Sequence, residues 1–209
     1  MKSWFLIPVL ALLIGCGTSQ ENDSLFDQAL GGLRGSEFVP RFTALLKAEA
    51  PALQIGFVER QEGGTLLLER RDGGFDYWLS PDGVQIILQN GMLHGTRGLG
   101  EGLLASELSQ PLSHVRGLTS GYSDRFHTYL DGNDQAETRT YRCLFTVGKQ
   151  SEVALRSKTV QTVQMRENCR SLDQEFTNIY WVTPETRRIV QSRQWAGPFV
   201  GALSTRVVE

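Results

Sequence analysis

The sequence has few of the residues that build metal sites, and no excess of charge of either sign. Its 209 residues include three His and three Cys, and 21 Lys and Arg stand against 23 Asp and Glu. The His and Cys residues are too scattered for the close ligand pairs of a zinc site, so we expect no metal and no other cofactor. A net charge of −2 gives no surplus of cations for a phosphate backbone, which argues against nucleic-acid binding.

The sequence also lacks an apolar run long enough to cross a bilayer. Its longest uncharged apolar stretch, Trp4–Ile14, follows Lys2 and would span only about 16 Å as a helix, roughly half of a hydrocarbon core. A short apolar stretch behind a basic residue is typical of a signal peptide. We therefore predict that residues 1–15 are a signal peptide absent from the mature protein.

The apolar stretch runs into Leu13–Cys16, LIGC, which resembles the bacterial lipobox. This predicts that Cys16 becomes the acylated mature N-terminus, inserted in a lipid leaflet, with residues 16–22 as a short polar tether. A plain secretory signal with an incidental Cys is the alternative. The next residue is Gly17 and not Asp, which by resemblance to enterobacterial sorting rules favours the outer membrane, with the domain facing the periplasm.

Two cysteines remain if Cys16 carries lipid. In the oxidising periplasm, Cys143 and Cys169 are candidates for a disulfide. A bridge closing a loop of some 25 residues would stabilise the domain by roughly 3 kcal/mol in the chain-entropy model. The alternative is a pair of buried thiols that act as small hydrophobic side chains.

Residues 23–209 are predicted to form a single, mainly β domain behind one or two short helices. Helical spacing of apolar residues covers 25–33, behind Asp23 and Ser24 as caps, and 38–50, where Pro51 blocks continuation. Alternating patterns separated by turn signals then predict strands. These are Leu53–Glu59, Thr65–Arg70, Asp76–Leu79, Val84–Gln89, Met92–His94, Asp124–Leu130, Arg139–Val147, Val153–Arg156, Thr159–Glu167, Phe176–Thr183, Ile189–Trp195 and Ala202–Val208.

Two hairpin turns can be assigned from local chemistry. The segment Ser80–Gly83, SPDG, has Pro second and Gly fourth, as a type I turn requires, and Asn90-Gly91 accepts the positive φ angles of a type I′ turn. Residues 95–121 are rich in Gly and Ser and fit either a weak helical turn or a packed loop. Because no βαβ spacing occurs, we expect an antiparallel barrel-like, half-barrel or sandwich fold.

Four segments carry recognisable motifs: Tyr77–Gly83, YWLSPDG; Asn90–Leu93, NGML; Tyr180–Val182, YWV; and Gln191–Trp195, QSRQW. They resemble the YjbF/GfcB lipoproteins of bacterial exopolysaccharide and group 4 capsule operons. The chain departs from the family pattern at Met92, where Arg is common, and at Val182-Thr183-Pro184, where a Val-Asp turn is common. The resemblance covers essentially the whole mature chain and implies a barrel-like β domain with a helix near the anchor.

The resemblance also implies a role in producing or exporting surface polysaccharide, beside an outer-membrane β-barrel protein and another periplasmic protein. It implies no catalytic residues.

No catalytic residues are predicted from the sequence itself. In the segment Gly117–Gly121 the Ser is displaced by one position from the place that a nucleophile elbow requires. Asp131–Asp134, DGND, lacks the later bidentate Glu of a calcium loop and is typical of a turn. Paired carboxylates converging across the sheet stay open as a route to a glycan-cleaving enzyme.

The candidate contact residues for a protein partner or a glycan are Gln191, Arg193, Trp195 and Trp78. An exposed Trp can stack on the C–H face of a sugar, and Arg can donate to hydroxyls or acidic sugars, although Trp on half-buried strands is usually core. Two functions follow as hypotheses: a non-enzymatic assembly lipoprotein of the export machinery, or a carrier that holds glycan or acyl chain in a half-open barrel. A filled interior favours the first, and a continuous concave groove favours the second.

Overall fold

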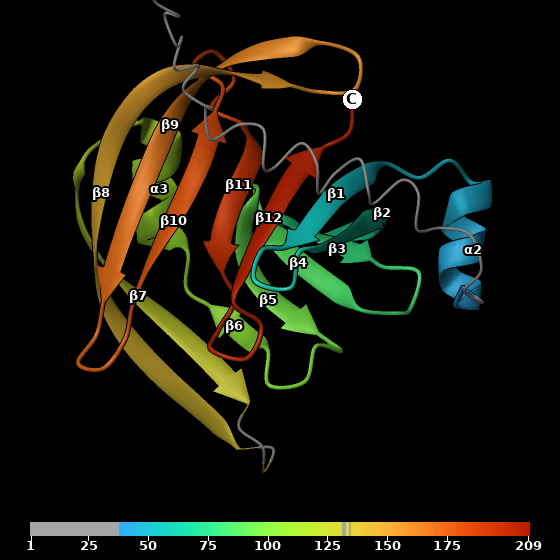
Figure 1. Ribbon diagram of the computed structural model, residues 1–209, viewed down its shortest axis with the longest axis horizontal. Coiled ribbons are helices and arrows are strands. Elements are labelled where there is room, and N and C mark those ends of the chain that lie inside the picture. The colour runs from blue at the N-terminus through green and yellow to red at the C-terminus, as the bar shows by residue number, and fades with distance from the viewer. Residues whose placement is uncertain (1–37, 131–132, 134) are drawn as a thin grey trace, which may run out of the picture.

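The computed structural model describes residues 38–209 except 131–132 and 134, and these residues form one large antiparallel sheet (Figure 1). The predicted helix over 25–33, the tether and Cys16 lie outside the described residues. Two helices and twelve strands are present in the described part: α2 (Pro40–Lys47), β1 (Ala52–Phe57), β2 (Glu62–Asp72), β3 (Phe75–Leu79), β4 (Gln85–Gln89), β5 (Met92–Arg97), β6 (Leu103–Ser106), α3 (Ser109–Gly117), β7 (Gly121–Leu130), β8 (Ala136–Ala154), β9 (Thr159–Arg170), β10 (Glu175–Val182), β11 (Ile189–Trp195) and β12 (Ala202–Val207).

The sheet curls until its two edge strands meet, which confirms the predicted antiparallel, barrel-like fold. The strand order is β5-β4-β3-β2-β1-β12-β11-β10-β9-β8-β7-β6. The edges β5 and β6 approach closely: a Cβ on Gly95 would lie 2.8 Å from the carbonyl oxygen of Leu104. Thr96 Oγ1 also donates to the carbonyl oxygen of Leu103 at 3.3 Å. Near-closure of this kind leaves little exposed strand edge.

Local turn chemistry sets the β3–β4 and β4–β5 hairpins as predicted. The amide of Gly83 donates to the carbonyl oxygen of Ser80 at 3.1 Å, which closes the SPDG turn. At the β4–β5 turn, Asn90 and Gly91 have φ of 50° and 88°, as a type I′ turn requires. A side chain at Gly91 would also collide with Ile189 of β11 at 2.8 Å, so this glycine permits both the turn and a close approach between strands.

The interior is divided into two packed compartments. One apolar cluster is built mainly from β1 to β5 and β12, and the other from β8 to β10 and α3. Gln194 of β11 crosses between them: its Oε1 accepts from the amide of Leu93 at 2.8 Å and its Nε2 donates to the carbonyl oxygen of Gly91 at 3.0 Å. Because β11 and β5 are not neighbours in the sheet, the hydrogen bonds of this side chain connect two strands across the barrel interior.

The helices cover opposite parts of the sheet (Figure 1). Phe42 of α2 packs on Leu67 and Leu79, and Val115 of α3 is buried among residues of β8 and β10. Pro at the first helical turn starts α2, which is shorter than the predicted 38–50. None of the described helices has the length and apolar character to cross a bilayer.

The structure differs from the sequence prediction in two segments. Residues 95–121, expected to form a weak helical turn or a packed loop, contain a helix, α3, and also a strand, β6, that was not predicted. The separate strands predicted at 139–147 and 153–156 are one strand, β8, because its pairing with β9 continues past a register shift between Val147 and Gln150. A polar segment inside a bulged strand hides the continuity from an alternation pattern.

Candidate functional site

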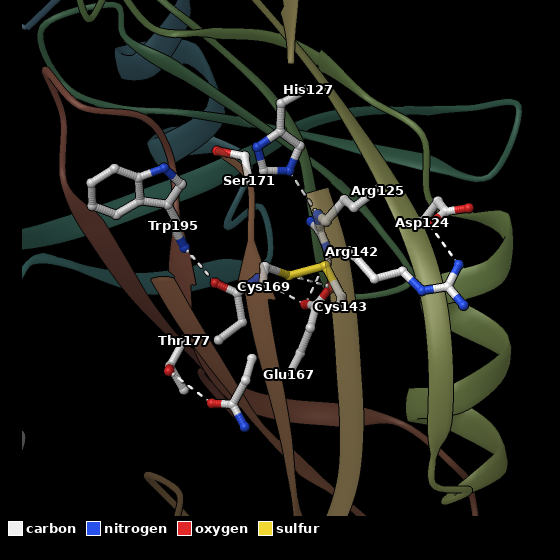
Figure 2. The surroundings of a disulfide bond; sticks show 12 residues. Asp124, Arg125, His127, Arg142, Cys143, Glu167, Cys169, Ser171, Thr177 and Trp195 are labelled. Carbon is white, nitrogen blue, oxygen red and sulfur yellow. Dashed lines mark hydrogen bonds and ion pairs between the residues drawn. A yellow bond between two sulfur atoms is a disulfide. The ribbon is translucent and has the colours of Figure 1, made fainter. Parts of the chain in front are cut away.

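Cys143 and Cys169 form the predicted disulfide, inside the barrel (Figure 2). They are direct partners in the register of β8 and β9, and both side chains are buried. The bridge therefore ties together two strands that are also held by an extended ladder. The two cysteines are 26 residues apart in the sequence. The disulfide therefore stabilises the fold mainly by lowering the conformational entropy of the unfolded chain, because the two strands are already paired at this point.

A buried ion pair lies beside the disulfide. Arg125 of β7 and Glu167 of β9 are fully buried, and the guanidinium Nη1 donates to both carboxylate oxygens at 2.9 and 3.0 Å. Oε2 of Glu167 also accepts from the amide of Asn178 at 2.8 Å and from the hydroxyl of Tyr180 at 2.7 Å. A buried charge needs this degree of hydrogen bonding to offset its lost hydration.

Electrostatics keep Arg125 charged and the neighbouring Tyr180 neutral. Burial opposes the charge on Arg125, yet the adjacent carboxylate of Glu167 raises the guanidinium pKa overall. Burial, followed by the charge of Glu167, raises the pKa of Tyr180 well above its ordinary value. Tyr180 therefore remains a phenol that donates to the carboxylate.

His127 extends the network and is fixed in one neutral tautomer. The Nε of Arg125 donates to His127 Nε2 at 2.7 Å, and a guanidinium cannot accept, so the proton of the imidazole lies on Nδ1. Nδ1 then donates to the hydroxyl of Tyr129 at 2.8 Å. Burial, and next the charge of Arg125, hold the pKa of His127 well below its ordinary value.

The chemistry available to this buried network is limited by access. Arg125, Glu167 and His127 are all fully buried, so a polymer cannot reach them without opening the sheet. Cys143, Glu167 and Cys169 are the one close grouping of metal-ligand residue types in the described ranges. Its two sulfurs are bonded to each other and its carboxylate is taken up by four hydrogen bonds, so it has no thiolate to offer a metal.

This buried network was not predicted from the sequence, although the pattern of residues along β7 indicates it. Ser123, Arg125, His127 and Tyr129 alternate along β7, and all four point to the buried side. A charged residue at the inward positions of an alternating strand indicates an internal partner, because an isolated buried charge is too costly. The identity of the partner, 42 residues away on β9, cannot be read from the strand itself.

The predicted contact residues are not brought together as one surface. Gln191 is buried, and its Oε1 accepts from Arg206 at 2.7 Å. Arg193 is exposed on β11. Trp195 is half-buried and stacks on Phe176 with ring centroids 5.7 Å apart, so it packs with the core of the second compartment.

Trp78 lies in the other compartment, where it borders a cavity at one mouth of the barrel. This mouth pocket has a volume of about 640 Å³. Its floor is formed by inward residues of β1, β3, β4, β11 and β12, namely Leu53, Trp78, Leu88, Val190 and Thr205. Behind the floor, Ile86, Leu93 and Leu203 are buried and packed, so the pocket does not continue as a channel through the barrel.

A curled antiparallel sheet with a filled interior and a pocket at one mouth defines a small barrel-like β domain. The sequence profile of the family described as "Group 4 capsule polysaccharide lipoprotein gfcB, YjbF" matches residues 34–208. Because the match spans most of the chain, the protein belongs to this family, which confirms the resemblance seen in the sequence. Family membership makes it a lipoprotein with a role related to capsule polysaccharide.

A solved structure supports the fold. The crystal structure of the hypothetical lipoprotein YmcC from Escherichia coli K12 is similar to this chain with a TM-score of 0.67. The two sequences are 18% identical, and the similarity covers 93% of this chain and 98% of that one. At this identity the comparison concerns the fold alone. A search of curated protein sequences finds no match.

Proposed function

We propose that the protein is an outer-membrane lipoprotein, anchored by acylated Cys16, with a non-enzymatic accessory role in producing or exporting capsule polysaccharide. It would act by assembling with an outer-membrane β-barrel protein and with periplasmic proteins of the same operon. The observation that carries this proposal is the filled interior. Two packed clusters occupy the barrel, and the charged groups inside it are bonded to one another. This supports a scaffold over a catalyst or a carrier of acyl chains.

Side-chain exposure on β11 and in the turn after it favours some of the candidate contact residues over others. Gln191 and Trp195 have internal contacts, whereas Arg193 is exposed and Phe199, in the following turn, has 54% of its surface exposed. An exposed Arg and an exposed aromatic side chain on one hairpin are residue types that are enriched at interface hot spots. Arg193 and Phe199 are therefore the first candidates for contact with a protein partner.

The test is capsule production in a strain lacking the gene and complemented with variants. The parent chain should restore surface polysaccharide, and Cys16→Ala should not, with the protein then released from the membrane fraction. The pair Arg193→Glu and Phe199→Ser should lower surface polysaccharide several-fold with normal anchoring. Leu172→Ser is the matched control, because Leu172 is a fully exposed apolar residue on the separate β9–β10 turn.

Three results would count against the proposal. Normal surface polysaccharide in the deletion strain would remove the capsule role. Full activity of the Arg193 and Phe199 variants would remove this surface from the assembly. Turnover of polysaccharide by the purified protein, abolished by one carboxylate substitution, would overturn the non-enzymatic role.

A further inference from the structure

Arginine side chains surround the mouth pocket on several sides. Arg71 comes from β2, Arg116 from the last turn of α3, and Arg187 and Arg188 from the β10–β11 turn. Two acidic residues, Asp76 and Glu209, line the same pocket. Segments far apart in the sequence thus place cations around an apolar floor.

Two of the four arginines are paired with carboxylates, and two are not. Arg71 donates to Asp76 at 2.8 Å, and Arg188 is bonded to Glu209, which also pairs with Lys158. Arg116 and Arg187 have no acidic partner among the described residues. Both are exposed and line the pocket, so their charges are accessible to a ligand that enters the mouth.

Arg116 and Arg187 are held next to each other through the backbone. The Nε of Arg116 donates to the carbonyl oxygen of Arg187 at 3.3 Å, and Nη1 of Arg187 donates to the carbonyl oxygen of Gly117 at 3.4 Å. Each contact uses one N–H of a guanidinium, which leaves the other donors available. Arg187 has φ of 56°, a left-handed conformation that an Arg adopts only where the surrounding turn imposes it.

The floor below these two arginines is apolar and contains an aromatic side chain. Trp78 is 6% exposed, and its indole Nε1 has no hydrogen-bond partner in the described part of the chain. A pyranose ring matches such a floor, since it offers a C–H face to apolar and aromatic side chains and hydroxyls to the exposed guanidinium donors above it. The volume of about 640 Å³ lies within the usual range of small-ligand sites.

We propose that the mouth pocket binds an acidic saccharide unit, with its carboxylate or phosphate between Arg116 and Arg187 and its ring on the Trp78 side of the floor. Planar guanidinium groups suit bidentate contacts to both kinds of anion. The packed residues behind the floor limit the ligand to a short segment and leave no channel for an acyl chain. This inference rests on the proposed role in capsule polysaccharide, and it adds direct glycan recognition to that role.

The test is binding by the purified full-length protein in detergent. The probes are acidic oligosaccharides obtained by partial hydrolysis of the cells' own surface polysaccharide, the same fraction after carboxyl reduction and removal of phosphate, and inorganic phosphate alone. The intact fraction should bind, should bind more weakly at high salt, and should shift the indole N–H resonance of Trp78, assigned with Trp78→Phe. The neutralised fraction should lose most of its affinity.

The variant Arg116→Gln/Arg187→Gln should weaken binding at least tenfold, because each charge-assisted hydrogen bond to an anion contributes about tenfold or more. Arg166→Gln removes an exposed Arg from β9, outside the pocket, and should bind like the parent. Unfolding midpoints of the three proteins would exclude a folding defect. Undiminished binding by the double variant, or equal loss in both variants, would overturn the assignment.

Other outcomes also decide the question. A surface polysaccharide with no acidic group, or equal binding of the intact and neutralised fractions, would overturn the anion site. If inorganic phosphate binds as tightly as the oligosaccharide, the apolar floor contributes nothing to affinity and the saccharide assignment is overturned.

Two outcomes separate this inference from the proposed function. If no probe binds but gene deletion still abolishes surface polysaccharide, saccharide binding in the pocket is refuted and the proposed function stands. If a probe binds and deletion leaves the polysaccharide unchanged, the proposed function fails alone.

Discussion

The two compartments of this barrel are stabilised in different ways. The first, around Leu53, Ile86 and Leu203, holds neither a disulfide nor a buried ion pair among the described residues, so its stability comes mainly from area removed from water and from packing. The second holds a disulfide and the ion pair of Arg125 and Glu167. A non-directional force tolerates small changes of shape, whereas a buried ion pair depends on each partner being present. The second compartment should therefore respond more sharply to single substitutions.

The largest effect is expected from Glu167→Gln. The substitution leaves the charge of Arg125 fully buried without a counterion, and should lower the free energy of unfolding by about 3–5 kcal/mol. The double variant Arg125→Met/Glu167→Met removes both charges and should lose less than the single variant. Urea denaturation measures both values. Equal losses would mean that the unpaired charge is not the cause.

Loss of the disulfide should have the next largest effect. The double variant Cys143→Ala/Cys169→Ala should lower the free energy of unfolding by about 3 kcal/mol, because the separation of 26 residues sets the entropy of the loop. Reductant should destabilise the parent similarly and leave the double variant unchanged. Indifference of the parent to reductant, with free thiols verified by mass spectrometry, would contradict this account.

A smaller effect than these two is a dependence on pH that arises in the second compartment. The folded-state pKa of His127 is lowered, so its contribution is complete above the unfolded pKa of about 6.5 and is lost as pH falls toward the folded value. In that window the His127 contribution to the free energy of unfolding should fall by about 1.4 kcal/mol per pH unit. The slope should be shallower by this amount in His127→Gln.

A matched control comes from the apolar compartment. Ile86→Val should cost about 1 kcal/mol at all pH values, since Ile86 is fully buried in the apolar cluster and the change removes one methylene. Its pH profile should run parallel to that of the parent. Two results would contradict the distinction between an apolar and a pH-sensitive compartment. One is a free energy of unfolding that depends more steeply on pH in Ile86→Val than in the parent, and the other is an unchanged pH dependence in His127→Gln.

Much of the sheet could be predicted because its signals are local. The turns at Ser80–Gly83 and Asn90-Gly91 follow from residue types at fixed positions, and alternation located ten of the strands within a few residues. The strand β6 was missed because its four residues are too few for a period, and its pairing with β7 defines it. The candidate contact residues were chosen by residue type alone. Gln191 and Trp195 have the composition of a contact surface, yet packing turned both toward internal partners.

The amino-acid sequence alone determined the antiparallel β class, the two hairpin turns, the disulfide candidates and the family resemblance, since each depends on neighbouring residues or on residue type. Only the tertiary structure decided that Gln194 would cross to β5, that Arg125 would meet Glu167, and that Arg116 and Arg187 would face one pocket. These contacts join residues 101, 42 and 71 positions apart. Their partners are set by how far the sheet curls before its edges meet, which is a sum over all strand pairings and not a property of any one segment.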